Sequence, residues 1–220
     1  MRIAILGSGL MGSALGTVWA RVGHDVAFSY SRDPAKLRSL AREAGGQSTA
    51  SPPNDAVRAA EVVLVSVPWH HLDDALHAAG GGQAFAGKVV VTCSLPMLAD
   101  DSDLAIGHET SGAEELARRL PDARVIAAFN TVPSELIRTE LLQTLGDRHD
   151  RPNVVISGDD AMAKATVTSL ARDAGFAPID AGALRVSRWI EPFGLLVGQL
   201  AYAQDLGSAL GYRFVRAHQP

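Results

Sequence analysis

The chain has 220 residues, of which 47% are hydrophobic and 20% are charged, and its formal net charge at pH 7 is -4. This length can bury the core of a full α/β domain with a small appendage, and the composition is that of an ordinary globular protein. The mildly acidic charge, with no block of like charges, gives no reason to expect nucleic-acid or acidic-membrane binding, because both require a concentrated basic face.

The N-terminal run and the single cysteine bear on the cellular compartment. Residues 1–6 are too short an apolar run for a signal peptide, and no stretch reaches the roughly 18 to 20 apolar residues that span a bilayer. Cys93 has no partner for an internal disulfide, which fits a reducing compartment. We therefore expect a cytoplasmic protein with no membrane association.

Short apolar strands alternate with helices through the first 129 residues. The predicted strands are residues 2–6, 25–30, 61–67, 88–93 and 123–129. The predicted helices are residues 10–22, 33–44, 52–60, 69–79 and 112–120. A long polar loop is expected at 94–111. This alternation predicts an α/β protein: a Rossmann, doubly wound parallel sheet with helices on both faces.

The alternation weakens after about residue 132. Strands are expected at 153–157 and 177–179, with a helix at 160–175 between them. Residues 183–217 are expected to be mainly helical, with a bend near Pro192 and Gly194. We place a soft boundary at 132–152 between a Rossmann domain, residues 1–132, and a small, mainly helical C-terminal domain, residues 133–220.

A glycine-rich turn follows the first predicted strand, with the sequence Gly7-Ser8-Gly9-Leu10-Met11-Gly12. In such a motif the first glycine allows the tight turn, the second lets a pyrophosphate approach the backbone, and the third lets the helix pack on the sheet. The free N–H groups and the dipole of the helix start then hold the phosphates. The motif therefore predicts a dinucleotide site.

The end of the second predicted strand distinguishes an NAD site from an NADP site. NAD sites usually place an acidic residue there for the ribose hydroxyls. Here the strand exits as Ser31-Arg32, and a guanidinium and a hydroxyl can both bind a 2′-phosphate. Lys36 lies one helical turn further on and adds charge, while Asp33 is placed to cap the helix. We therefore expect NADP(H).

These motifs resemble the NADPH-dependent F420 reductase (F420:NADP oxidoreductase) family, in its broad bacterial branch. The resemblance covers nearly the whole chain and keeps order and spacing. Besides the glycine-rich turn and Ser31-Arg32, the matching segments are residues 65–71, 127–133, 157–160, 179–184 and 187–188.

The resemblance implies an enzyme that passes hydride between NADP(H) and a deazaflavin, F420. It implies no catalytic acid or base, because both partners are hydride carriers and the protein supplies orientation and exclusion of water. The C-terminal part would help to form a cleft and a homodimer, and the apolar residues at 190–202 fit such an interface. The resemblance places six further residues beside the ribose and nicotinamide: Val67, Pro68, Trp69, Asn130, Thr131 and Val132.

The chain departs from the family at Asn130, where F420-using members often carry a histidine. A flavin, FMN or FAD, is an alternative acceptor, because it also presents a flat ring that accepts hydride. No metal is expected, since the adjacent His70 and His71 point about 100° apart on a helix.

Two alternatives stay open. A dehydrogenase or reductase of a small carbonyl or imine would need a proton donor, and Lys164 is the only late lysine. An NADP-binding redox sensor without turnover would share the same cofactor motifs.

Overall fold

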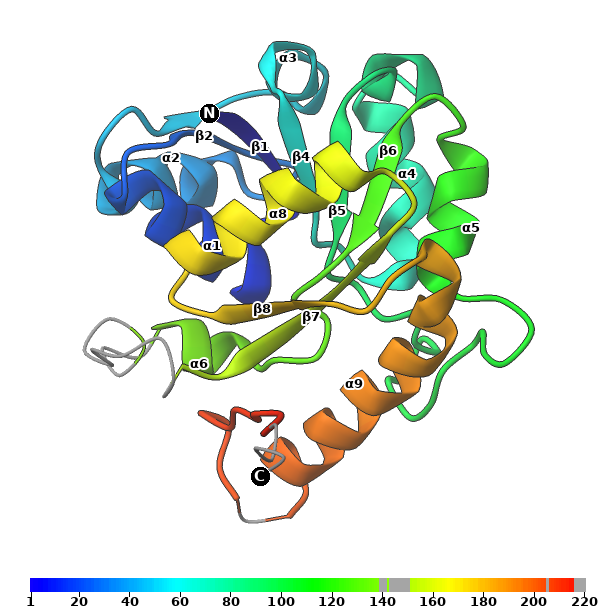
Figure 1. The fold of residues 1–220 in the computed structure, drawn as a ribbon. Helices are drawn as coiled ribbons and strands as arrows, with labels where there is room; N and C mark the ends of the chain where they lie inside the picture. The colour runs from blue at the N-terminus through cyan, green and yellow to red at the C-terminus, as the bar shows by residue number, and fades with distance from the viewer. Residues whose placement is uncertain (139–141, 143–150, 205, 216–220) are drawn as a thin grey trace.

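Eight strands form a single sheet in the order β3-β2-β1-β4-β5-β6-β7-β8 in the computed structural model (Figure 1). The structure describes residues 1–138, 142, 151–204 and 206–215. The strands are β1 (Arg2–Leu6), β2 (Asp25–Ser29), β3 (Thr49–Ala50), β4 (Val62–Val65), β5 (Val89–Thr92), β6 (Arg124–Ala127), β7 (Asn153–Gly158) and β8 (Ala177–Asp180). The predicted α/β, Rossmann-type sheet is confirmed.

Helices cover both faces of this sheet, as Figure 1 shows. The described helices are α1 (Leu10–Arg21), α2 (Pro34–Ala44), α3 (Pro53–Ala59), α4 (Leu72–Ala78), α5 (Gly112–Arg119), α6 (Ser134–Arg138), α8 (Ala161–Asp173) and α9 (Ser187–Tyr202). Short 3-10 turns lie at Trp69–His71, Gly82–Phe85 and Leu184–Val186. Within the described residues, no helix is both long and apolar enough to cross a membrane.

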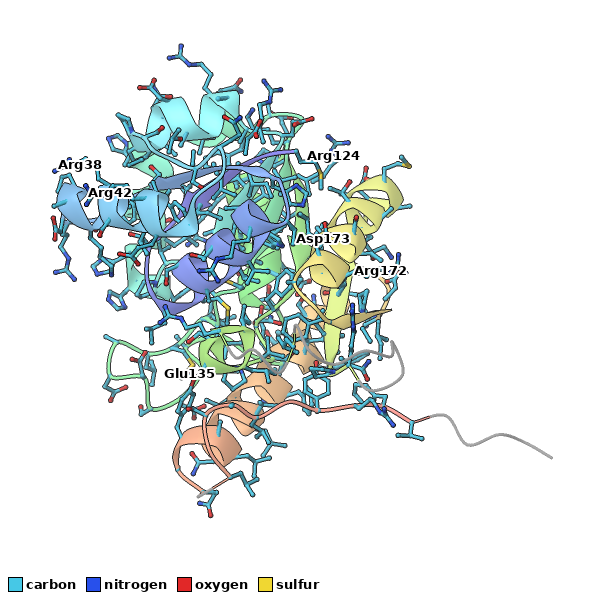
Figure 2. The ribbon with its side chains drawn as sticks, turned by 90° about the vertical axis from the view of Figure 1, so that its left-hand side faces the viewer. Arg38, Arg42, Arg124, Glu135, Arg172 and Asp173 are labelled. Carbon is cyan, nitrogen blue, oxygen red and sulfur yellow. The ribbon has the colours of Figure 1, made fainter. Side chains whose placement is uncertain are left out.

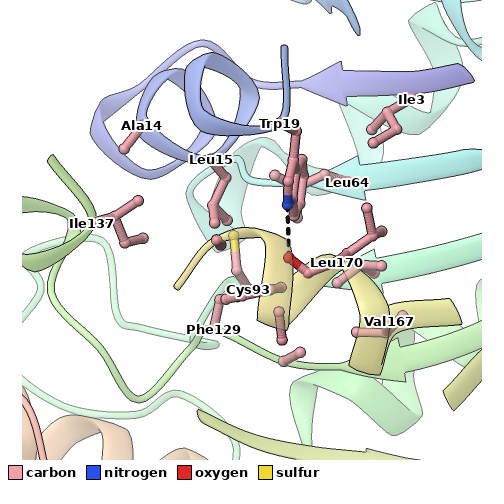
Figure 3. Close-up of a cluster of buried hydrophobic side chains, with 14 of the residues drawn as sticks. Ile3, Ala14, Leu15, Trp19, Leu64, Cys93, Phe129, Ile137, Val167 and Leu170 are labelled. Carbon is pink, nitrogen blue, oxygen red and sulfur yellow. Dashed lines mark hydrogen bonds between the residues drawn. The ribbon is translucent and has the colours of Figure 1, made fainter. Parts of the chain in front are cut away.

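One of the two hydrophobic cores joins the N-terminal and C-terminal halves of the chain. It lies between the sheet and helices α1, α2, α6 and α8, and the other lies beneath α3, α4 and α5. In the first core, the indole N–H of Trp19 donates to the backbone carbonyl of Leu170 at 2.9 Å (Figure 3). The ring of Trp19 also meets Phe129 edge-on, with centroids 5.8 Å apart. This packing holds α8 against α1.

The strands of the first 129 residues, β1 to β6, are parallel as predicted, and one later pair departs from this pattern. All neighbouring strands run parallel except β6 and β7, which are antiparallel. For two consecutive strands to be parallel neighbours, the connection must cross back to the end of the sheet where the first strand began. β7 instead begins beyond the carboxyl end of β6 and runs back alongside it. Only the following α8 makes a crossover, from β7 to β8.

The C-terminal end of the chain corrects one prediction. Residues 183–217 were expected to be mainly helical, but α9 ends at Tyr202. Gly207 then has a left-handed backbone, with φ of 84°, and the chain folds back so that the Asn153 N–H donates to the Tyr212 carbonyl at 2.8 Å. Residues 216 and 217 lie outside the described residues, as does most of the boundary region at 132–152. The domain division stays a prediction.

Candidate functional site

The turn after β1 is fixed by contacts with the end of β4. Gly7 has φ of 104°, which favours glycine, and a Cβ there would collide with the carbonyl of Ser66. The Ser66 hydroxyl donates to the Gly7 carbonyl at 2.8 Å. A Cβ at Gly12 would collide with the same Gly7 carbonyl. Gly7 therefore allows the tight turn and Gly12 lets α1 pack closely on it, as the motif predicts.

Gly9 differs, because it faces open space. A Cβ at Gly9 would meet no atom within 4 Å. No side chain caps α1 at Gly9, so the first N–H groups of the helix are free to bind an anion. This geometry supports the predicted pyrophosphate position.

A large cavity of about 1070 Å³ opens beside this turn. Its walls come from the turn itself, the end of β2, the start of α2, the segment before α3, and the loop after β4. The predicted site residues that line it are Gly7, Ser8, Gly9, Ser31, Arg32, Lys36, Val67 and Pro68.

The cations of this cavity are available to a ligand. Arg32 and Lys36 are exposed, and within the described residues neither side chain has a hydrogen bond or an ion pair. Arg38 of α2 lines the cavity as well. Arg42, further along α2 (Figure 2), does not. The Asp33 carboxylate, which also lines the cavity, caps α2 by accepting the Ala35 N–H at 2.8 Å.

Tyr30 is a cavity residue that the sequence analysis did not single out. It lies at the end of β2 with a left-handed φ of 58°. Burial and the neighbouring Asp74 raise the pKa of its phenol. His70 and His71 line the same cavity, with ring centroids 4.3 Å apart. In the described part of the chain, no three His, Cys, Asp or Glu side chains gather as a metal site.

Trp69 does not lie on the cavity wall, in contrast to its neighbours Val67 and Pro68. Its ring packs against the core beneath α3, α4 and α5. The Arg119 guanidinium lies 5.5 Å from the ring centroid. The structure thus gives Trp69 a packing role.

A smaller cavity of about 280 Å³ lies on the other side of the same turn. Its residues come from the start of α1, the ends of β5 and β6, and one face of α9. They are Leu10, Met11, Cys93, Leu95, Phe129, Asn130, Thr131, Val132, Pro133, Ser134, Gly194, Val197, Gly198 and Tyr202. Most are apolar, and of the polar ones Thr131, Ser134 and Tyr202 have hydrogen-bond partners, so a polar group without a partner is unusual here.

Asn130 is that polar group. It is 7% exposed, and neither its Oδ1 nor its Nδ2 has a hydrogen-bond partner. A buried polar group without a partner costs about 1–3 kcal/mol. The preceding Phe129 has a left-handed φ of 66°, which is uncommon for a residue with a side chain. A ligand that offers one donor and one acceptor would satisfy this amide.

The neighbouring Thr131 is held from the C-terminal segment. Its hydroxyl lies 2.7 Å from the Tyr212 hydroxyl, and Thr131 is 1% exposed. Tyr212 in turn packs edge-on against Phe193 of α9, with ring centroids 4.9 Å apart. The loop after β6 is therefore supported by a segment about 80 residues further along the chain, a contact that the sequence pattern did not indicate.

The titratable residues of the small cavity are poor acids at neutral pH. Among the described lining residues these are Cys93 and Tyr202. Burial raises the pKa of the Cys93 thiol to about 12. Burial and a 2.8 Å hydrogen bond to Glu135 raise the pKa of Tyr202 to about 12. Such a cavity suits a reaction that depends on orientation more than on proton transfer.

The two cavities meet at consecutive residues of one turn. Gly7, Ser8 and Gly9 line the large cavity, and Leu10 and Met11 line the small one. A molecule with an anionic centre at Gly9 would therefore extend one half into a cationic cavity and the other half into an apolar one. This is the shape of a dinucleotide.

Comparison with known proteins identifies relatives of this arrangement. Residues 2–96 match the family described as NADP oxidoreductase, coenzyme F420-dependent. A crystal structure from Arthrobacter sp. FB24, provisionally named an F420-dependent NADP reductase, has a TM-score of 0.84 at 25% identity, covering 98% of this chain and 100% of that one. A reductive aminase from Aspergillus terreus solved with NADPH has a TM-score of 0.66 at 17% identity, which shows the fold alone, and covers 91% of this chain and 61% of that one.

Two curated relatives are similar over much of this chain. Metalloreductase STEAP3 of Rattus norvegicus is 31% identical over 194 residues, covering 88% of this chain and 36% of that protein. A glycerol-3-phosphate dehydrogenase, NAD(P)+ type, of a Bradyrhizobium strain is 31% identical over 175 residues, covering 68% of this chain and 52% of that protein. The chain thus spans about a third to a half of the length of these relatives.

Proposed function

We propose that this protein, whose residues 2–96 match the family described as NADP oxidoreductase, coenzyme F420-dependent, is an enzyme that transfers hydride between NADP(H) and the flat ring of a deazaflavin (F420) or a flavin. The match of residues 2–96 confirms the family resemblance predicted from the sequence motifs. The observation that carries the proposal is the pair of cavities on either side of Gly9 and Leu10.

The large cavity supports the choice of NADP(H). The 2′-phosphate would lie among Arg32, Lys36 and the Ser31 hydroxyl, which at present accepts the Asp33 N–H at 3.1 Å and can still donate. Charge-assisted hydrogen bonds from a guanidinium to phosphate are about twice as strong as neutral ones. NAD(H), which lacks that phosphate, would leave these cations without a partner.

The small cavity supports the position of the nicotinamide. Its carboxamide group offers one donor and one acceptor, which are complementary to the unpartnered Oδ1 and Nδ2 of Asn130. Bound NADPH would supply the hydride. Asn130 would orient the ring, and the apolar walls formed by Leu95, Val132 and Val197 would exclude water from it.

The structure offers little for acid catalysis of a carbonyl or imine. Lys164, the candidate proton donor, instead donates to Asp180 at 2.9 Å and lines neither described cavity. Two cations that could bind an acidic acceptor tail, Arg185 and Arg188, are also engaged: Arg185 lies over Trp189, and Arg188 forms a double hydrogen bond with Glu114. Because these cations are engaged, we propose that the acceptor is bound through its flat ring and not through a charged tail.

The proposal is tested with purified protein and NADPH, offered F420, FMN and FAD in turn, by following NADPH oxidation and acceptor absorbance together. Reduction of at least one ring at a rate far above that without protein is the expected result. Binding of NADPH without reduction of any acceptor would favour a redox sensor. Reduction of small carbonyls or imines alone would favour the dehydrogenase alternative. The cytoplasmic location and the homodimer remain predictions of the sequence.

A further inference from the structure

Two glycines one helical turn apart on α9, Gly194 and Gly198, both line the small cavity. Their surroundings differ. A Cβ at Gly194 would lie 2.5 Å from the carbonyl oxygen of Asn130, so packing of α9 on the loop after β6 requires glycine there. A Cβ at Gly198 would meet no atom within 4 Å.

Packing therefore does not explain the glycine at Gly198. Its backbone is not among those with positive φ, so backbone conformation does not require glycine either. Inside a helix, glycine is less favourable than alanine. Of the glycines inside the described helices, Gly12, Gly16, Gly112 and Gly194 each have a close neighbour, and Gly198 alone faces open space. The fold thus accepts a destabilising residue at this place.

Gly9 shows the same combination of a negative φ and open surroundings. There the space is explained by the pyrophosphate that the turn is built to bind. By the same reasoning, the space beside Gly198 is explained by a ligand. The buried Asn130 amide, which lines the same cavity without a hydrogen-bond partner, points independently to a ligand there.

We infer that Gly198 is a specificity-determining residue that leaves room for the edge of the acceptor's flat, conjugated ring beside the nicotinamide. This inference rests on the proposed function and deepens it. Most residues that line this cavity, Leu95 and Val197 among them, are apolar, and an apolar wall suits the face of an aromatic ring better than a small polar substrate. A side chain at Gly198 would occupy the position of the ring.

The test compares Gly198→Ala and Gly198→Leu with wild type and with Gln199→Leu. Gln199 is the next residue of α9, is exposed and does not line the described cavity, so it controls for added apolar bulk on the helix. Gly198→Ala should raise the melting temperature by about 2–4 °C, because alanine is the better helix former. It should nevertheless lower kcat/KM for the ring acceptor about tenfold, with NADPH affinity unchanged within about twofold.

Gly198→Leu should lower acceptor reduction about 100-fold or more while NADPH still binds, and Gln199→Leu should behave as wild type. Equal acceptor kinetics in wild type and Gly198→Leu would overturn the role of Gly198 and leave the proposed function intact. A fall in melting temperature for Gly198→Ala would also overturn it, because it would mean that protein fills the space. If wild-type protein reduces no ring acceptor, the proposed function itself fails, and this inference with it.

Discussion

Two residues with bulky side chains, Tyr30 and Phe129, have left-handed backbones, with φ of 58° and 66°. Such conformations cost on the order of 1–3 kcal/mol and persist only where the surroundings enforce them. Phe129 is enforced by edge-on contacts with Trp19 and Phe176, at centroid distances of 5.8 and 6.2 Å. Each residue comes directly before a proposed cofactor loop. The strain therefore marks the two strand ends where the chain turns toward the ligand.

Arg32 carries the proposed discrimination between NADPH and NADH. Replacing Arg32 with Ala should raise KM for NADPH by roughly 10–100-fold, because a charged hydrogen bond contributes about 1.5–3 kcal/mol. KM for NADH should change little. Steady-state kinetics with both cofactors measure the effect. Arg42→Ala is the matched control, since Arg42 is an exposed arginine of α2, the helix that follows Arg32, and does not line the large cavity. An unchanged cofactor preference in Arg32→Ala would exclude the assignment.

Substitution of Asn130 should affect stability and cofactor binding in opposite directions, because its unpartnered amide destabilises the fold and is proposed to bind the nicotinamide. Asn130→Leu removes two unpartnered polar atoms from a buried position and replaces them with an apolar group of similar size. The melting temperature without ligand should therefore stay the same or rise. Affinity for NADPH should fall about tenfold, while affinity for 2′-phospho-ADP-ribose, which has no nicotinamide, should not change. Equal losses for both ligands would place Asn130 outside the nicotinamide site.

At the scale of elements, α9 is tied to α5 by a buried carboxylate. Glu191 of α9 is 1% exposed, and its oxygens accept the N–H groups of Gly112 and Ala113 at 2.8 and 3.0 Å. Burial raises the pKa of Glu191 to about 7, and the nearby Glu114 contributes to the increase. Glu114 itself is paired with Arg188. The same helix forms one wall of the small cavity, so this contact also positions the cavity.

A pH dependence of stability follows from Glu191. Because the folded state raises its pKa above the ordinary value of 4.5, ionisation of this carboxyl costs stability. The cost is absent at pH values below 4.5 and grows until the pH has passed about 7. The unfolding equilibrium constant should thus increase over this window, by at most about tenfold per pH unit from this group.

Denaturant titrations of wild type and Glu191→Gln across the same window measure this effect. The variant should lack the contribution of Glu191 to the slope, whatever its absolute stability. Asp103→Asn is a suitable control, because Asp103 is exposed and lies in the polar loop before α5. Parallel curves for wild type and Glu191→Gln would show that Glu191 does not titrate in this range.

Most elements could be predicted from periodicity, and the exceptions have physical reasons. β3 has only two residues and α6 only five, so neither extends over enough residues to give a pattern. The antiparallel β7 depends on where the connection runs, which an apolar strand pattern does not encode. Residues 206–215 were included in the expected helix, yet contacts with β7 and α9 fix them in an irregular path.

The candidate site was predictable where a local motif defines it. The glycine-rich turn and Arg32 lie on the cavity wall as expected. Trp69 does not, because the 3-10 turn at Trp69–His71 directs it toward the core. Tyr30 and Gly198 gave no signal in the sequence, since one depends on its backbone conformation and the other on empty space beside a helix. Both are properties of the assembled fold.

At the scale of the whole molecule, a homodimer remains a proposal that the surface supports. Trp189 and Leu196, seven residues apart on α9, are 64% and 52% exposed, and Phe214 is 60% exposed. Light scattering after size exclusion should give a molar mass of twice the chain mass for wild type. Leu196→Glu should lower it to the mass of a single chain. Met162→Glu, at an exposed position of α8, is the control. A wild-type monomer at all concentrations would reject the dimer.

The central claim is that the two cavities align NADPH and a flat ring for direct hydride transfer. NADPH carrying deuterium on one face of the nicotinamide C4 tests it, with F420 as acceptor, because a deazaflavin retains the transferred hydrogen on carbon. Mass spectrometry of the reduced F420 should show deuterium from one labelled face and none from the other. Loss of the label to water, or equal transfer from both faces, would contradict a site that holds the two rings in one fixed orientation.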